Sequence, residues 1–164
     1  MPLPKKPRLL FVSLAILIAD LLSKAWITAN FELYESRSII AGFFSLTHVE
    51  NRGVAFGFLS FLGDAGPPAL IAAGTVALIV VSLYFRQTPS QQTLLLAALA
   101  LILGGAVGNL VDRAVHGSVT DFLDVYFRSY HWYTFNVADS AISVGIGLML
   151  LDLLRERRRP AAER

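Results

Sequence analysis

Five aspartates lie in or beside apolar stretches of this chain, and their carboxyl groups are the side chains best suited to chemistry. They are Asp20, Asp112, Asp121, Asp124 and Asp139. A charged carboxylate at the centre of a membrane helix costs roughly 2.5–3.5 kcal/mol on insertion scales. Such groups persist where they form ion pairs, bind ions, relay protons or catalyse reactions, so the five must be separated by role.

Two of them, Asp121 and Asp139, are placed for acid–base catalysis. Asp121 follows residues 117–120, which read as a loop returning to the membrane surface, and Asp139 stands at the outer entry of an apolar stretch. Two carboxyl groups a few Å apart share one proton and supply one acid and one base. Such a pair can hydrolyse a peptide bond without a metal or a cysteine. Taken singly, Asp139 could be a carboxylate that stabilises the amino terminus of a helix through the helix dipole, and Asp121 could be a solvated loop residue.

The other polar groups in these stretches have structural interpretations. Asp20 and Lys24 are four residues apart, so a helix brings them together as an ion pair. Gly104 and Gly108 form a small-xxx-small face that lets two helices approach closely.

Further along, Asn109 is an amide in an apolar stretch and must find hydrogen-bond partners. Asp112 is followed at once by Arg113, which predicts a charge-paired rim at the end of a helix. Asp124 receives no role and is interpreted as solvated.

The composition indicates a membrane protein. Of the 164 residues, 55% are hydrophobic and 16% are charged, whereas soluble domains carry about 25% charged residues. The absence of cysteine excludes disulfides, thiolate nucleophiles and cysteine-based metal sites. His48, His116 and His131 do not have the spacing of zinc ligands, so neither a metal nor another cofactor is expected.

Four apolar stretches approach the ~20 residues that a helix needs to cross a bilayer. They cover residues 9–29, 69–85, 93–111 and 135–154. The first continues too far for a cleaved signal peptide and is interpreted as a retained helix. The sequence therefore predicts an all-α integral membrane protein with four transmembrane helices, as one domain over residues 1–164.

The segment between the first two stretches has strand character. Residues 38–40, 43–49 and 54–59 are rich in β-branched and aromatic side chains, and glycines with other breakers separate them. They predict a small β-sheet over residues 38–61 that rests on the membrane surface, and residues 63–68 end it.

The basic residues give an orientation. Nine Lys and Arg residues lie at the two ends of the chain and in the 86–92 link, and four lie in the two other loops. The positive-inside rule then places both termini in the cytoplasm and segments 30–68 and 112–135 on the outer side. This clustering accounts for the pI of about 9.2 without a nucleic-acid partner.

Five blocks of residues, in this order, resemble the lipoprotein signal peptidase (signal peptidase II) family of bacterial inner membranes. The blocks are Asp20 with Lys24, residues 51–56 (NRGVAF), residues 104–113 (GGAVGNLVDR), residues 119–122 (VTDF) and residues 135–141 (FNVADSA). Val54 and Thr120 stand where the family more often has Ala and Val, and neither change removes a functional group.

The resemblance implies an aspartic intramembrane protease that cleaves prolipoproteins on the amino side of a diacylglyceryl-modified cysteine. It implies a catalytic pair, Asp121 and Asp139, supported by Asp20 and Lys24. The residues that it implies for substrate binding and for shaping the site are Asn51, Gly53, Gly108, Asn109, Asp112, Arg113, Asn136 and Ala138. It also implies an extracytoplasmic β-sheet cradle, a short interfacial helix and inhibition by the cyclic peptide globomycin. Self-association is not expected, so the protein is predicted to be a monomer.

Two other functions remain open at this point. A small transporter or channel subunit could use Asp20, Asp112 and Asp139 as a proton or cation relay, but a relay needs acids at successive depths and these gather toward the outer ends. A membrane scaffold would leave Asp121 and Asn136 without a role.

Overall fold

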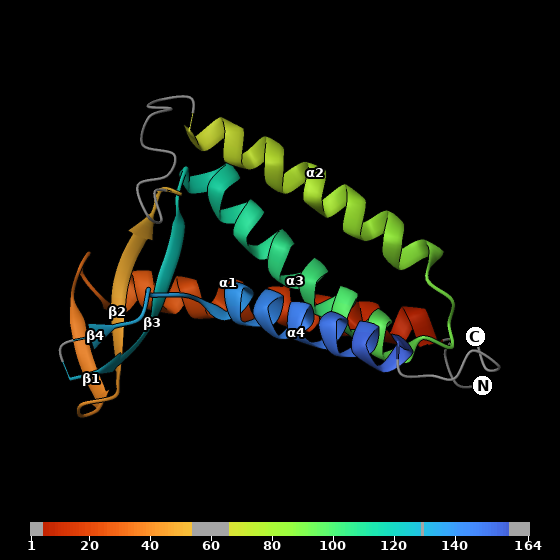
Figure 1. Ribbon diagram of the computed structural model, residues 1–164. Helices are drawn as coiled ribbons and strands as arrows, with labels where there is room; N and C mark the ends of the chain where they lie inside the picture. Colours follow the sequence, from red (N-terminus) through yellow and green to blue (C-terminus); the bar gives the residue numbers. More distant parts are fainter. Residues whose placement is uncertain (1–4, 54–65, 129, 158–164) are drawn as a thin grey trace.

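The computed structural model describes residues 5–53, 66–128 and 130–157, which form four long helices and a small sheet across one end of them (Figure 1). The helices are α1 (Lys5–Asn30), α2 (Gly66–Gln87), α3 (Thr93–His116) and α4 (Val137–Arg157). Each is long and apolar enough to cross a membrane, which confirms the four predicted spans. No helix in these described ranges is shorter than 21 residues, so the predicted short interfacial helix is not found in them.

Helix α3 packs against all three other helices and forms the centre of the bundle. Fifty-six per cent of its apolar segment is buried within the protein, whereas only 6% of the corresponding segment of α2 is buried. The outward faces of the surrounding helices therefore expose apolar side chains, as helices that cross a bilayer do.

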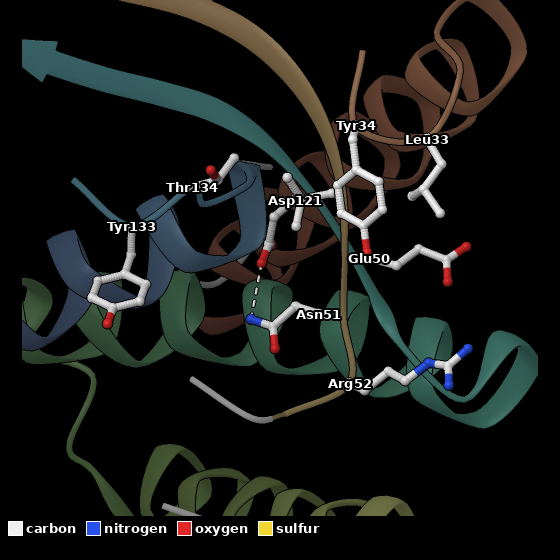
Figure 2. Close-up of a pocket in the computed structure, with 9 residues that line it drawn as sticks. Leu33, Tyr34, Glu50, Asn51, Arg52, Asp121, Tyr133 and Thr134 are labelled. Atoms are coloured by element: carbon white, nitrogen blue, oxygen red, sulfur yellow. Dashed lines mark hydrogen bonds between the residues drawn. The ribbon is translucent and has the colours of Figure 1, made fainter. Parts of the chain in front are cut away.

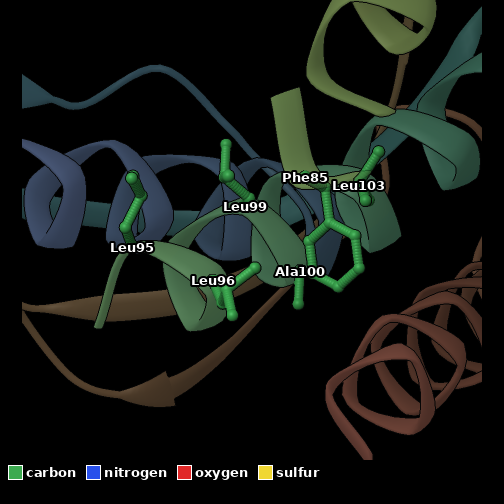
Figure 3. Close-up of a cluster of buried hydrophobic side chains, with 6 residues drawn as sticks. All are labelled: Phe85, Leu95, Leu96, Leu99, Ala100 and Leu103. Atoms are coloured by element: carbon green, nitrogen blue, oxygen red, sulfur yellow. The ribbon is translucent and has the colours of Figure 1, made fainter. Parts of the chain in front are cut away.

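One apolar cluster joins α2 to α3 (Figure 3). Phe85 of α2 contacts a ladder on α3 that consists of Leu95, Leu96, Leu99, Ala100 and Leu103. This cluster fixes the end of the bundle opposite the sheet, where α1 begins, α4 ends and α2 is linked to α3 (Figure 1).

The predicted small-residue face of α3 is present and serves two helices. A Cβ on Gly104 would lie 2.6 Å from the backbone oxygen of Ser13 in α1, and one on Gly108 would overlap the Asp20 carboxylate. Gly105 performs the same function for α4, because its Cβ would collide with the backbone oxygen of Ala138. Glycine thus allows α1 and the start of α4 to approach α3 at the depth of the buried polar groups.

The sheet is antiparallel, with four strands in the order β1-β2-β3-β4. The strands are β1 (Ser36–Ile40), β2 (Phe44–Asn51), β3 (Val119–Phe127) and β4 (Tyr130–His131). The first two match predicted strands. The third predicted strand, residues 54–59, lies outside the described residues, as do residues 61–65 of the predicted sheet end and breaker.

The prediction that Asp121 lies in a loop is wrong, because it is the third residue of β3. The run VTDFLDVYF contains five strand-favouring Val, Phe and Tyr residues. The two aspartates in this run argued against a strand in the sequence, because Asp is depleted in strands. Pairing of β3 with β2 brings residues 119–125 beside residues 44–51, which are separated from them in sequence by α2 and α3.

Candidate active site

Asp121 lies at the floor of an open cleft of about 570 Å³ between the sheet and the start of α4 (Figure 2). It is 2% exposed and pairs with Val49 of β2 across the sheet. A register shift separates this pair from the Leu46–Leu123 pair, and such bulges often re-aim side chains beside active sites. The cleft is lined by Leu33, Tyr34, Val49, Glu50, Asn51, Arg52, Asp121, Tyr133 and Thr134.

Asn51 connects the end of β2 to Asp121. Its Nδ2 donates to Asp121 Oδ2 at 3.0 Å, and its Oδ1 accepts the N–H of Gly53 at 2.8 Å. Gly53 has a φ of +85°, a left-handed conformation that favours glycine. The turn therefore fixes the Asn51 amide so that it faces the carboxyl group.

Asp139 lies in the first turn of α4, as predicted. Its backbone N–H donates to Asn136 Oδ1 at 2.9 Å, and its Oδ2 accepts the Asn136 N–H at 3.4 Å. This reciprocal pair is a capping box at the helix amino terminus. The Asp139 carboxylate is half-buried, and its rotation is restricted by the helix that it caps.

Two buried amides bring Asp121 and Asp139 into one cluster. The Nδ2 group of Asn136 donates to Asp121 Oδ1 at 2.6 Å and lies 3.2 Å from Asn109 Oδ1. The Nδ2 group of Asn109 donates to Asp139 Oδ1 at 2.7 Å. Each carboxyl group is thus held by a neutral donor, and the two predicted catalytic residues share one hydrogen-bond network.

Burial raises the pKa of Asp121 to about 7. The negative charge of Asp139 adds to this rise, while hydrogen bonds from Asn51 and Asn136 oppose it. Near neutral pH the Asp121 carboxyl group can therefore either hold or release a proton, as a general acid or base must.

Behind this pair, Lys24 is the centre of a buried ionic cluster. Its Nζ lies 2.7 Å from Asp20 Oδ2, 3.0 Å from Asp112 Oδ2 and 3.1 Å from Asn109 Oδ1. The predicted ion pair between Asp20 and Lys24 is confirmed. The prediction that Asp112 is a rim residue paired with Arg113 is wrong, because Asp112 is 3% exposed and contacts Lys24.

The two carboxylates of this cluster also hold backbone groups of the site. Asp20 Oδ1 accepts the Ala138 N–H at 2.8 Å, one of the free donors at the start of α4. Asp112 Oδ2 accepts the Thr120 N–H at 3.1 Å, next to Asp121. Asp20 and Asp112 therefore position the segments that carry Asp139 and Asp121.

Arg113 lies one helical turn beyond Asn109 on α3. Its Nη1 lies 3.4 Å from the Asn109 backbone oxygen. Its Nε is buried without a hydrogen-bond partner in the part of the chain that the structure describes.

Asp124 is not solvated, contrary to the sequence-based interpretation. It is 6% exposed, and both its oxygens lie 3.0 Å from His131 Nδ1. The residues Tyr34 and Tyr133, which line the cleft, were also not predicted. Strand alternation could have shown that Asp124 shares a face with Tyr126, but the contacts across β2, β3 and β4 depend on tertiary pairing.

A metal site is not indicated by the described residues. Within residues 5–53, 66–128 and 130–157, no three His, Asp or Glu side chains converge as they would around a metal ion.

A family model and the curated relatives point to the same family of proteins. A family model described as "Signal peptidase (SPase) II" matches residues 12–155. A protein named lipoprotein signal peptidase from Geobacter sulfurreducens is 49% identical over 152 residues, which cover 92% of this chain and 93% of that protein. A lipoprotein signal peptidase from Shewanella loihica is 44% identical over 158 residues, which cover 93% of this chain and 89% of that protein.

Two solved structures share the fold. Both are described as bacterial membrane enzymes studied by the in meso method. The first, at 2.3 Å resolution, superposes with a TM-score of 0.83 at 27% identity, over 93% of this chain and 90% of its own. The second, at 1.9 Å resolution, has a TM-score of 0.82 at 26% identity, over 90% of this chain and 93% of its own.

Proposed function

Because the chain belongs to the signal peptidase II family and is a membrane protease that removes signal peptides from prolipoproteins, we propose that Asp121 and Asp139 carry out the hydrolysis. The observation that carries this proposal is the hydrogen-bond network in which Asn109 and Asn136 join the two carboxyl groups. Asp121 also faces the open cleft, where an extended peptide can reach it.

Asp121 holds the proton that the pair shares, and Asp139 is the base. Asp139 takes a proton from water as the oxygen attacks the scissile carbonyl carbon, and Asp121 gives its proton to the carbonyl oxygen. The tetrahedral intermediate then breaks its C–N bond. The leaving amine takes a proton from Asp139, and the carbonyl re-forms as its proton returns to Asp121. The products are a carboxylic acid and an amine, and both aspartates return to their starting states.

The remaining polar residues position the pair and the substrate. Asn51, Asn109 and Asn136 supply neutral hydrogen bonds, which cost less to bury than charges. Arg113 donates from its buried Nε to a backbone carbonyl of the substrate. Gly53 and Gly108 leave space beside Leu70 and Asp20, respectively.

The substrate is a prolipoprotein whose cysteine already carries a diacylglyceryl group, and cleavage occurs on the amino side of that cysteine. Its acyl chains remain in the bilayer, so its scissile bond lies near the membrane surface. The sheet end of the bundle then faces outward from the bacterial inner membrane, and both termini face the cytoplasm. The chain acts as a single monomeric membrane domain, and globomycin occupies the cleft.

The test compares two peptides that differ only in the diacylglyceryl group on cysteine. Purified protein should cleave the lipidated peptide and leave its unlipidated counterpart intact. Asp121→Asn and Asp139→Asn should each abolish cleavage while the protein remains folded. Asp124→Asn is the matched control, because Asp124 lies on the same strand but contacts His131, and it should retain activity. Near-normal cleavage by Asp121→Asn or Asp139→Asn would refute the catalytic pair.

The relay function is not favoured. In the described structure, Asp20, Asp112 and Asp139 are joined through Lys24 and Asn109 in one cluster. The family relationship supports a protease instead.

A further inference from the structure

The sheet has one apolar face and one polar face. Leu46 and Leu123 are cross-strand partners, and both pack against a buried cluster formed by Ile27 of α1, Phe31 just after that helix and Phe122 of β3. The neighbouring pair on the same face is Phe44 and Val125. This face therefore covers the helix bundle where the strands lie above α1.

The opposite face carries polar groups that bond to one another. Ser36 Oγ lies 2.8 Å from Thr47 Oγ1, Thr47 Oγ1 donates to Asp124 Oδ2 at 3.4 Å, and His131 Nδ1 contacts Asp124. The His131 ring stacks on Tyr126 with its centroid 4.8 Å away. An antiparallel sheet with one such face normally presents it to water.

The apolar face continues past the helices and becomes exposed there. Phe44 and Val125 are half-buried, but Ile40, the partner of Phe44, is 53% exposed. The next cross-strand pair, Phe127 and Tyr130, is 68% and 69% exposed.

Trp132 extends this apolar row. Its N–H donates to the Val125 oxygen at 2.8 Å, and the residue is 62% exposed. We use the term "lip" for the four side chains Ile40, Phe127, Tyr130 and Trp132. The β1–β2 and β3–β4 turns, which carry the lip, lie together at the end of the sheet farthest from α2 (Figure 1).

The sheet begins close to the ends of the membrane-spanning helices. Only five residues separate α1 from β1, β3 begins three residues after α3 ends, and the strands run across the end of the bundle (Figure 1). The lip is therefore expected near the level at which these helices leave the hydrocarbon. At that level Trp and Tyr are the preferred side chains, because their rings combine an apolar body with a polar group. Arg128, beside the lip, offers a cation to lipid phosphates.

We infer that the lip binds the surface of the outer leaflet and anchors the free end of the sheet in the lipid headgroup layer. The occupant is lipid, because the apolar face that seals the sheet on α1 continues without a break into the exposed side chains, and the spans beside it are covered by lipid. Since β3 also carries Asp121, the anchor fixes the height of that carboxyl group above the bilayer. This consequence rests on the proposed role of Asp121, whereas the lipid contact itself does not.

The chain offers a native probe for the test, because it contains only two tryptophans. Trp26→Phe leaves Trp132 as the sole tryptophan in protein reconstituted into phosphatidylcholine and phosphatidylglycerol vesicles. Its emission should be lost to lipids brominated high on the acyl chain, and less so to lipids brominated near the chain end. Aqueous iodide should quench it weakly.

The control places a tryptophan on the polar face of the same sheet. Ser36→Trp in a Trp26→Phe, Trp132→Phe background should be quenched by iodide and unaffected by brominated lipids. Equal iodide quenching of the two probes would overturn the anchor. Protection of Trp132 from both quenchers would also overturn it, because it would indicate a protein partner on the lip. Neither measurement uses a substrate, so the result does not depend on the proposed catalytic pair.

Discussion

At the scale of single residues, the aspartates of the site differ in what stabilises them. Asp20 and Asp112 contact the Lys24 ammonium group, whereas Asp121 and Asp139 contact the neutral amides of asparagines. Burial raises the pKa of Asp121. Asp121 also lines the cleft, so it is placed to exchange a proton with a bound peptide.

The raised pKa of Asp121 predicts a pH dependence of cleavage. Because Asp121 is proposed to supply a proton, kcat/KM should fall as the pH rises through about 7. The bond from Asn51 lowers the pKa of Asp121, so Asn51→Leu should move this fall to higher pH. A pH–rate profile of the lipidated peptide measures the shift.

The control for this profile is Asn30→Leu, because the Asn30 amide donates to the Trp26 oxygen of its own helix at 2.7 Å. This variant should reproduce the parent profile. A profile for Asn51→Leu that keeps the parent midpoint would show that Asp121 does not set the alkaline limb.

The ionic cluster leads to a prediction about stability. Lys24→Met would leave the carboxylates of Asp20 and Asp112 buried without their cation, and breaking a buried pair in this way costs about 3–5 kcal/mol. The variant should therefore lose much of its thermal stability in detergent and its activity. Lys6→Met is the control, since Lys6 makes an exposed bond to the Arg86 oxygen, and it should melt within a few degrees of the parent. Equal melting temperatures for the two variants would contradict the structural role of Lys24.

The sequence predicted part of this arrangement. Motif resemblance singled out Asp121 and Asp139, which the structure joins in one hydrogen-bond network. Helical spacing predicted the ion pair between Asp20 and Lys24. The contact between Lys24 and Asp112 was not predictable, because it joins α1 to α3 and depends on how the helices pack. The adjacent Arg113 offered a simpler local partner, which the structure does not use.

At the scale of elements, the site depends on how closely α3 approaches the start of α4. Gly105 allows that approach, because any side chain there would collide with the Ala138 oxygen. The same segment holds Asn136 and Asp139 through the capping box. A displacement of α4 would therefore move Asp139, the proposed base, and the Asn136 amide that bonds to Asp121.

Two glycine substitutions separate this effect from helix propensity. Gly105→Ala should destabilise the protein by about 1–3 kcal/mol through overpacking and should lower kcat. Gly147→Ala in α4 has nothing within 4 Å of the added carbon, so it should be neutral or stabilising. Melting temperature and cleavage rate measure both effects, and a fully active Gly105→Ala would contradict the close-packing argument.

The elements themselves were predicted unevenly. Length and hydropathy were sufficient for the four helices, because a span must be long and apolar whatever its neighbours are. The sequence did not reveal β3, since Asp121 and Asp124 interrupt its apolar pattern. Their carboxyl groups are bonded by partners from other segments, such as Asn51 and Asn136 for Asp121 and His131 for Asp124. Its strand state is decided by tertiary partners.

At the scale of the whole molecule, the sheet and the α2–α3 link lie at opposite ends of the bundle (Figure 1). The distribution of Lys and Arg predicts that the link faces the cytoplasm. Exposed residues are available at both ends, for example Glu32 before β1 and Gln91 in the link.

Because the chain has no cysteine, single-cysteine variants can test this orientation. In intact cells with a permeable outer membrane, an impermeant maleimide should label Glu32→Cys. It should label Gln91→Cys only after the inner membrane is opened. The reverse pattern would place the catalytic cleft on the cytoplasmic side.

The sheet topology also determines the order in which the segments of the site are synthesised and can come together. Strand β2 leaves the ribosome before α2, but its partner β3 follows α3, and the Asn136 amide comes later still. Asp121 therefore meets Asn51 and Asn136 only after β2, β3 and the start of α4 have all been made and brought together. If Asp121 and Asp139 form the catalytic pair, as proposed, the nascent chain is inactive until α4 has joined the bundle.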